Sequence, residues 1–127
     1  MTDASDLAQA RIGQIAINAR DLPRAVAFYR DTLGLRFLFE VPGMAFFDCG
    51  GIRLLVGTAV RPELDHPSSI LYFRVADIRA THAELKSRGA NFLNEPHRVA
   101  RMPDHELWLA EFQDSEGSTL ALMSEIR

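Results

Sequence analysis

Imidazole and carboxylate groups gather in one short stretch near the end of the chain. His97 and His105 flank a polar segment, and Glu111 follows on a run with the composition of a strand. Imidazole nitrogens and carboxylate oxygens bind Zn²⁺ and other divalent ions, so these three residues are a candidate metal site. Their spacing matches no dedicated zinc motif. The alternatives for residues 98–104 are a loop that contacts a ligand and a solvated loop.

Hydrogen-bond donors suited to a small organic ligand occur in strand-like runs elsewhere. Arg53, Tyr72 and Arg74 are flanked by apolar residues, and Gln14 and Asn18 are the polar ends of another such run. A guanidinium group binds an anionic or carbonyl group, and a phenol or amide adds further hydrogen bonds. These residues predict a site for a compact molecule with such a group. The alternative is that both arginines lie at strand ends and reach solvent.

The sequence contains no recognised arrangement for covalent catalysis. It has no Gly-x-Ser-x-Gly motif, no phosphate-binding glycine-rich loop and no dinucleotide-binding fingerprint. Cys49 follows two phenylalanines and an aspartate, a setting more typical of a buried, inert thiol than of a nucleophile. As the single cysteine it cannot form an intramolecular disulfide, which fits a reducing compartment.

The composition is that of an ordinary soluble, globular protein. The 127 residues are 47% hydrophobic and 24% charged, which fits one domain with a sizeable core. A net charge of −3 without a cluster of Lys and Arg argues against a nucleic-acid partner. No apolar run approaches the ~20 residues that cross a bilayer, so we expect no membrane partner. The acidic start of the chain lacks the features of a signal peptide, and we expect a cytoplasmic protein.

The elements that must position these side chains occur twice. In each half an apolar strand leads to an aspartate, Asp21 or Asp77, placed as a helix N-cap. A helix-like stretch follows and ends at Gly34 or Gly89. Three short strands come next in each half. We divide the chain into module 1, a linker and module 2 at about residues 12–58, 59–68 and 69–125.

Each module therefore contains, in order, a strand, a helix and three strands. A helix that covers one side of a four-stranded sheet leaves the other side open. Two such sheets that curve toward each other enclose a cup in which a ligand can lie. We predict an α+β fold: a single domain over residues 1–127 in which two tandem βαβββ modules pair their curved sheets into an open cup.

The register of the strands decides which side chains face the cup. In one register Leu54, Leu120 and their apolar neighbours at alternate positions lie under the helices. The other register would place Arg53, Tyr72 and Arg74 there instead. Burying an unpaired charge costs several kcal/mol, against about 1.5–3 kcal/mol gained for each buried Leu or Ile, so we predict the first register.

The strand expected at residues 106–112 is ambiguous in this respect. Trp108 lies on one of its faces and Glu111 on the other. Trp108 is therefore either a core residue or an aromatic wall of the ligand site, and both interpretations stay open.

Two strings in the chain resemble those of a known family. The string from Asp21 to Gly34 is similar to the first-helix signature of the vicinal oxygen chelate superfamily, which contains glyoxalase I, bleomycin-resistance proteins and extradiol dioxygenases. The string from Phe112 to Ser118 resembles its closing motif, Phe-x-Asp-Pro-x-Gly-Asn, with serines in place of the Pro and the Asn. The resemblance covers about residues 12–125 and implies the glyoxalase/bleomycin-resistance fold.

The resemblance also implies where a metal would bind. Members that use a divalent ion hold it with four side chains, from the first and last strands of each module. The corresponding residues here are Gln14, Leu55, Ile70 and Ala121. Only Gln14 carries a ligand atom, whereas such an ion needs several oxygen or nitrogen ligands. We therefore predict no metal and no other cofactor.

Two functions are compatible with these observations. The preferred one is a metal-independent binding protein of the bleomycin-resistance type, which sequesters a small organic molecule without changing it. The alternative is an enzyme, a glyoxalase-like lyase or isomerase or an extradiol-type dioxygenase, with a divalent ion at the non-standard site of His97, His105 and Glu111. We also expect a homodimer, because free sheet edges invite a second chain. The predicted ligand-binding residues are Gln14, Asn18, Arg53, Leu55, Ile70, Tyr72, Arg74, Trp108 and Ala121.

Overall fold

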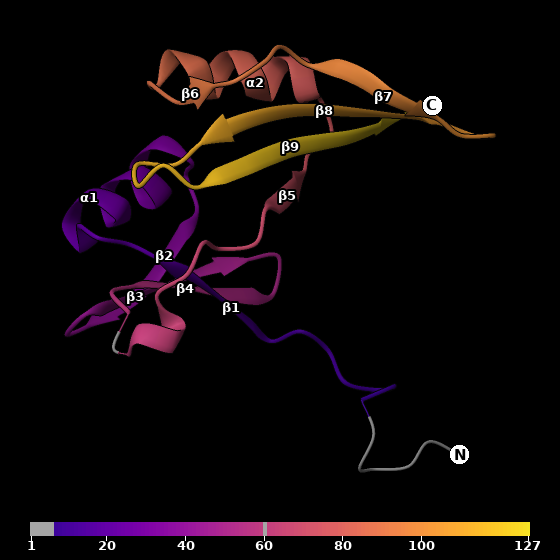
Figure 1. Ribbon diagram of the computed structural model, residues 1–127. Coiled ribbons are helices and arrows are strands. Elements are labelled where there is room, and N and C mark those ends of the chain that lie inside the picture. Colours follow the sequence, from indigo (N-terminus) through magenta and orange to yellow (C-terminus); the bar gives the residue numbers. More distant parts are fainter. Residues whose placement is uncertain (1–6, 60) are drawn as a thin grey trace.

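Two β-sheets, each with a helix packed on one side, form the protein (Figure 1). The structure is a computed structural model that describes residues 7–59 and 61–127. The first sheet has the order β1 (Gln14–Asn18), β4 (Ile52–Gly57), β3 (Met44–Cys49) and β2 (Arg36–Val41). The second has the order β5 (Leu71–Arg74), β9 (Thr119–Ile126) and β8 (Glu106–Gln113), with β6 (Asn91–Phe92) and β7 (His97–Arg101) both paired to β8. In each sheet the first strand of the module pairs in parallel with the last. The predicted α+β fold of two related modules is confirmed.

The helices occupy the same place in both modules. Their bounds are Leu22–Ala27 for α1, Phe28–Thr32 for the π-helical turn η1 that continues it, and Ile78–Ser87 for α2; a short 3₁₀ turn, η2, spans Pro62–Leu64 in the linker. Gly34 and Gly89 follow the two helices with φ of +73° and +98°, in the left-handed region that favours glycine. Within residues 7–59 and 61–127, no helix has the length and apolar character needed to cross a bilayer.

Both helices start at the predicted caps. The carboxylate of Asp21 accepts a hydrogen bond from the backbone N–H of Arg24 at 3.1 Å. Asp77 accepts the equivalent bond from the N–H of Ala80, also at 3.1 Å. Each cap satisfies a backbone donor that has no partner inside the helix, so it fixes where the helix begins.

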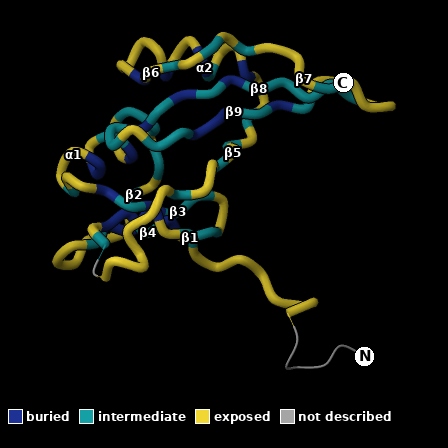
Figure 2. The backbone as a smooth tube through the Cα atoms, in the orientation of Figure 1, coloured by how far each residue is buried: buried dark blue, intermediate teal, exposed yellow. Residues whose placement is uncertain are grey.

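Alternation along the strands sorts the side chains onto two faces of each sheet, buried and exposed (Figure 2). On the faces under the helices, side chains at most 2% exposed include Ile17, Leu54, Val56, Leu120 and Leu122. Arg53, Tyr72 and Arg74 lie on the opposite faces and are exposed. The predicted register is therefore confirmed, and we call these opposite sides the open faces of the two sheets.

The segment that begins at His97 forms strand β7 rather than the loop expected between the two histidines. β7 pairs antiparallel with β8 and lies on the same edge of the sheet as β6. Pro96, which has no N–H to donate, lies in the interruption between β6 and β7. In this interruption the Asn94 side chain supplies hydrogen bonds to β8. Its Oδ1 accepts from the Glu111 N–H at 2.8 Å, and its Nδ2 donates to the Glu111 carboxylate at 3.0 Å.

A buried aspartate joins the turn between β8 and β9 to the helix of module 1. Asp114 Oδ1 accepts hydrogen bonds from the backbone N–H groups of Glu116 and Ser118, both at 2.8 Å, and so shapes the turn. Its other oxygen accepts from the Tyr29 hydroxyl at 2.7 Å. Tyr29 is fully buried. Burial, together with the nearby Asp114 carboxylate, raises the pKa of this hydroxyl far above its ordinary value and keeps it protonated as the donor.

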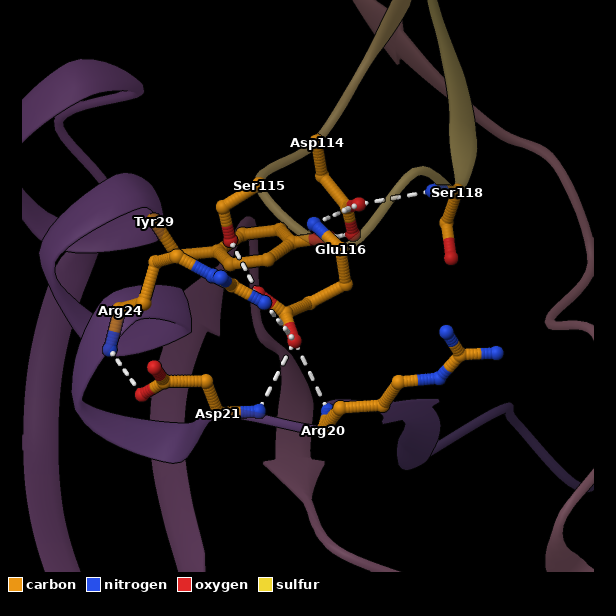
Figure 3. Close-up of polar contacts among 8 residues, drawn as sticks. All are labelled: Arg20, Asp21, Arg24, Tyr29, Asp114, Ser115, Glu116 and Ser118. Carbon is orange, nitrogen blue, oxygen red and sulfur yellow. Dashed lines mark hydrogen bonds and ion pairs between the residues drawn. The ribbon is translucent and has the colours of Figure 1, made fainter.

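Glu116, in the same turn, makes a second connection to module 1 (Figure 3). Its Oε1 accepts from the backbone N–H groups of Arg20 and Asp21 at 2.8 and 2.9 Å, and its Oε2 pairs with Arg24 Nε at 2.7 Å. Ser115 Oγ donates a further bond at 3.0 Å. The Glu116 side chain is only 3% exposed. The pKa of the Glu116 carboxyl is lowered from 4.5 to about 2, and the hydrogen bond from Arg24 is the largest cause.

We expect Tyr29→Phe to lower the free energy of unfolding by about 1–3 kcal/mol, because one oxygen of the buried Asp114 loses its donor. Urea denaturation monitored by circular dichroism measures this. Tyr72→Phe is the matched control: Tyr72 is 50% exposed and has no hydrogen bond among the described residues, so we expect a change within about 0.5 kcal/mol. Equal effects of the two substitutions would contradict the role of the Tyr29 hydroxyl.

The lowered pKa of Glu116 predicts how stability depends on pH. The folded protein binds the Glu116 proton less readily than the unfolded chain, so this stabilisation is complete above pH 4.5 and is lost as the pH falls toward 2. Glu116→Gln should therefore flatten the decline in unfolding free energy between about pH 5 and pH 2. Urea denaturation at a series of pH values tests this, with Glu84→Gln on the exposed face of α2 as control. Parallel pH profiles for wild type and Glu116→Gln would rule the contribution out.

Candidate functional site

The open face of the first sheet carries an arginine with a fixed orientation. Arg53 Nε donates to Gln14 Oε1 at 2.9 Å, between paired residues of β4 and β1. The guanidinium carbon lies 5.5 Å from the centre of the Phe46 ring. The terminal nitrogens of Arg53 have no hydrogen-bond partner among the described residues. They are therefore available to an anionic group on this face.

An aromatic pair lies beside this arginine. Phe46 stacks on Phe39 with ring centres 4.5 Å apart and an angle of 24° between the ring planes. Phe39 remains 44% exposed. Leu55 pairs with Phe46 across β3 and β4, so its side chain lies on the same face. The face thus combines a flat apolar platform with the cationic group of Arg53.

A β-bulge in β2 produces the aromatic pair. Strict alternation would place Phe37 and Phe39 on one face of the strand. The register shifts between them, so Phe37 pairs with Phe47 in the core while Phe39 pairs with Phe46 on the open face. Sequence reasoning missed Phe39 because the alternating pattern gives no sign of the bulge. It also missed Phe46, although regular alternation in β3 places this residue opposite Leu55 on the open face.

The open face of the second sheet offers fewer free groups. Tyr72 pairs with Ala121 across β5 and β9, and Glu111 pairs with Ala121 from the other side. The Tyr72 hydroxyl has no partner among the described residues. Arg74, in contrast, donates to the Glu125 carboxylate at 2.9 Å. Of the two arginines proposed for ligand binding, Arg53 forms no ion pair among the described residues, although Asp48 lies opposite it across β3 and β4.

A cavity of about 660 Å³ lies at the junction of the two modules. Asn18 and Ile70 line it, whereas the other seven predicted ligand-binding residues do not. Asn18 Nδ2 donates to the backbone carbonyls of Leu64 and His66, each at 2.8 Å, and so holds the linker. Within one chain eight of the predicted residues therefore lie on the two open faces or in this cavity, and Trp108 lies elsewhere.

The structure places Trp108 on the face under α2. Its register partners in β9 put it on the same side as Ala110 and Phe112, which are fully buried. The Arg79 guanidinium of α2 lies 4.8 Å from the Trp108 ring centre, and Trp108 Nε1 donates to Glu106 at 3.0 Å. Trp108 is thus a residue of the helix-packed side and not a wall of the open face, where Glu111 lies instead.

The three residues of the alternative metal site are engaged separately. His97 Nδ1 contacts the backbone carbonyl of Glu95 at 2.8 Å, and His105 Nδ1 contacts the Asp104 carboxylate at 2.7 Å. The Glu111 carboxylate accepts a hydrogen bond from the side-chain amide of Asn94, which lies between β6 and β7. Across residues 7–59 and 61–127, no three His, Cys, Asp or Glu side chains form a group able to hold a metal ion. The proposed combination of His97, His105 and Glu111 is therefore not assembled.

Cys49 lies at the end of β3 and is partly buried. Burial, and then the neighbouring Asp48 carboxylate, raise the pKa of its thiol above the ordinary value. A nucleophilic cysteine needs the opposite shift. The environment fits the inert thiol expected from the sequence.

Residues 11–122 match the model of the Glyoxalase/Bleomycin resistance protein/Dioxygenase superfamily. The chain belongs to this superfamily. The uncharacterized protein YraH of Bacillus subtilis is 31% identical over 117 residues, which cover 74% of this chain and 91% of that protein. A glyoxylase-like domain-containing protein of Didymella fabae is 28% identical over 126 residues, with 88% and 91% covered.

Solved structures of superfamily members share the fold. A member from Sphaerobacter thermophilus superposes with a TM-score of 0.75 at 22% identity, covering 91% of this chain and 98% of that one. Lactoylglutathione lyase from Agrobacterium tumefaciens gives a TM-score of 0.67 at 21% identity, with 91% and 93% covered. At these identities the likeness concerns the fold.

The residues that the resemblance assigns to the superfamily's metal positions do not fit a divalent ion. Leu55, Ile70 and Ala121 have aliphatic side chains with no atom that can coordinate a metal. Gln14 is the one residue of the four with a ligand atom, and its Oε1 already accepts the bond from Arg53. In this chain Gln14, the residue that could supply a metal ligand, instead orients the side chain of Arg53.

Proposed function

We propose that this superfamily member is a metal-independent binding protein of the bleomycin-resistance type, which sequesters a compact organic molecule on the open sheet faces. The observation that carries this proposal is the arrangement of Arg53, which is oriented by Gln14 and lies over the ring of Phe46, which in turn stacks on Phe39. The arrangement provides binding groups and contains no nucleophile and no set of metal ligands.

The same arrangement favours a planar ligand with an anionic group. A flat ring can stack on the exposed Phe39, which gains burial and an aromatic contact. The free end of Arg53 can then bind a carboxylate with two parallel hydrogen bonds. Gln14 limits the rotation of Arg53, so less conformational freedom is lost when the ligand binds.

A thermal-shift assay with 2-naphthoate and its neutral analogue 2-naphthamide tests this site. Because a ligand of the native state raises the melting temperature, we expect a larger shift with naphthoate than with naphthamide. In Arg53→Ala the two shifts should become equal, with an affinity loss for naphthoate of about tenfold. Arg30→Ala, which removes an arginine paired to Asp31 on the surface of η1, is the matched control. An unchanged naphthoate response in Arg53→Ala would remove Arg53 from the site.

Metal analysis of the same preparations separates binding from the alternative enzymatic function. A glyoxalase-like lyase or an extradiol-type dioxygenase would require a divalent ion. Elemental analysis and titration with Ni²⁺, Mn²⁺, Fe²⁺ and Zn²⁺ should show no stoichiometric site. One tightly bound ion per chain would contradict the proposed function.

The open faces also suggest that two copies of the chain associate. Phe39 and Tyr72 are 44% and 50% exposed in the single chain, and a second copy would cover apolar surface of this kind. Light scattering coupled to gel filtration should give twice the 14.2 kDa mass of the chain. A 14.2 kDa species at every concentration would exclude the dimer.

A further inference from the structure

The cavity at the junction of the modules is separate from the face that carries Arg53 and Phe46. It is bounded by the end of β1, the residues after β4, the linker and the turn between β8 and β9. Arg20, Thr58, Asp65, Ser68, Ser118 and Thr119 are among the residues that line it. The lining is mostly polar and includes charges of both signs. A volume of about 660 Å³ is in the range of small-molecule sites.

Arg20 presents a free positive charge to this cavity. Its backbone N–H is held by Glu116 at 2.8 Å, so the position of the residue is fixed. Its guanidinium extends away from the Glu116 carboxylate (Figure 3) and has no ion-pair or hydrogen-bond partner among the described residues. The negative charge of Glu116 is already neutralised by Arg24, which binds both of its oxygens. Arg20 is therefore left for another anion.

Asp65 presents a free negative charge from the linker. The carbonyls of its two neighbours, Leu64 and His66, both accept hydrogen bonds from Asn18 at 2.8 Å. The backbone on either side of Asp65 is thus tied to β1. Its carboxylate has no hydrogen-bond or ion-pair partner in the described part of the chain, and it forms no ion pair with Arg20.

We propose that this cavity binds a small zwitterion, with a carboxylate placed on Arg20 and an ammonium group placed on Asp65. The two opposite charges line the same cavity on anchored backbone and have no partner among the described residues, so one molecule that carries both complementary charges can satisfy them together. The hydroxyl groups of Thr58, Ser118 and Thr119 supply further hydrogen bonds. The chemical class is that of a free amino acid or a dipeptide.

Three probes with the same dipeptide backbone separate the contributions of the two charges. Alanylalanine carries both, its N-acetyl derivative carries only the carboxylate, and its C-terminal amide carries only the ammonium group. Amide chemical shifts of the ¹⁵N-labelled protein report binding at the lining residues Ala19, Ser68 and Ser118. We expect alanylalanine to shift these signals and to bind about five- to tenfold more tightly than either blocked form.

Substitutions assign each charge to its partner. In Arg20→Ala the affinity for alanylalanine should fall to that of the amide, and in Asp65→Asn to that of the N-acetyl form. Arg20→Lys, which keeps the charge, should retain part of the preference. The exposed pair Arg30 and Asp31 does not line the cavity, so Arg30→Ala and Asp31→Asn are matched controls that should change nothing.

Three outcomes would overturn the proposal. One is an equal response to all three probes. Another is that alanylalanine does not shift the signals of the lining residues, or does so only with a dissociation constant well above about 1 mM. The third is an unchanged preference in Arg20→Ala and Asp65→Asn. This experiment does not involve Arg53, so a negative result leaves the proposed function untouched. A negative result with naphthoate likewise leaves the zwitterion site untouched.

Discussion

The carboxylate of Glu116 connects the two halves of the molecule. It lies in the last turn of the second sheet, yet every donor it binds apart from Ser115 belongs to the start of α1. A carboxylate removed from water is tolerated only where hydrogen bonds and an opposite charge replace its hydration, and Glu116 has both. Because Asp114 shapes the same turn and reaches Tyr29, one short segment fixes how the second sheet meets the first helix.

This connection also determines the chemistry available at the junction. By taking Arg24 and the two backbone N–H groups, Glu116 uses up the charge and the donors near the start of α1. What remains unpaired there is the side chain of Arg20. The open faces follow a similar principle, since Glu125 pairs with Arg74 while Gln14 leaves the end of Arg53 free. An arginine is thus available to a ligand only if its neighbours leave its guanidinium unpaired, and exposure alone does not decide this.

Most of the fold could be predicted from local chemistry. Asp21 and Asp77 are helix caps because their side-chain oxygens can accept a hydrogen bond from a free backbone N–H two or three residues later. The faces of the strands follow from the alternation of side chains and from the cost of burying Arg53 or Arg74. The site was less accessible. The positions of Phe39 and Trp108 depend on a bulge and on pairing with β9, and the partners of Glu116 in module 1 lie more than ninety residues away. Pairing over such distances leaves no local pattern.

The bulge in β2 divides one edge strand into two parts with different tasks. Before it, Phe37 packs in the core against Phe47; after it, Phe39 lies on the open face against Phe46. A substitution at Phe39 changes a surface that is already half in contact with water, whereas one at Phe37 opens a hole in the interior. The strand can therefore acquire a different ligand preference at one end while its other end continues to hold the sheet together, so that selection on recognition and selection on folding act on separate residues of the same element.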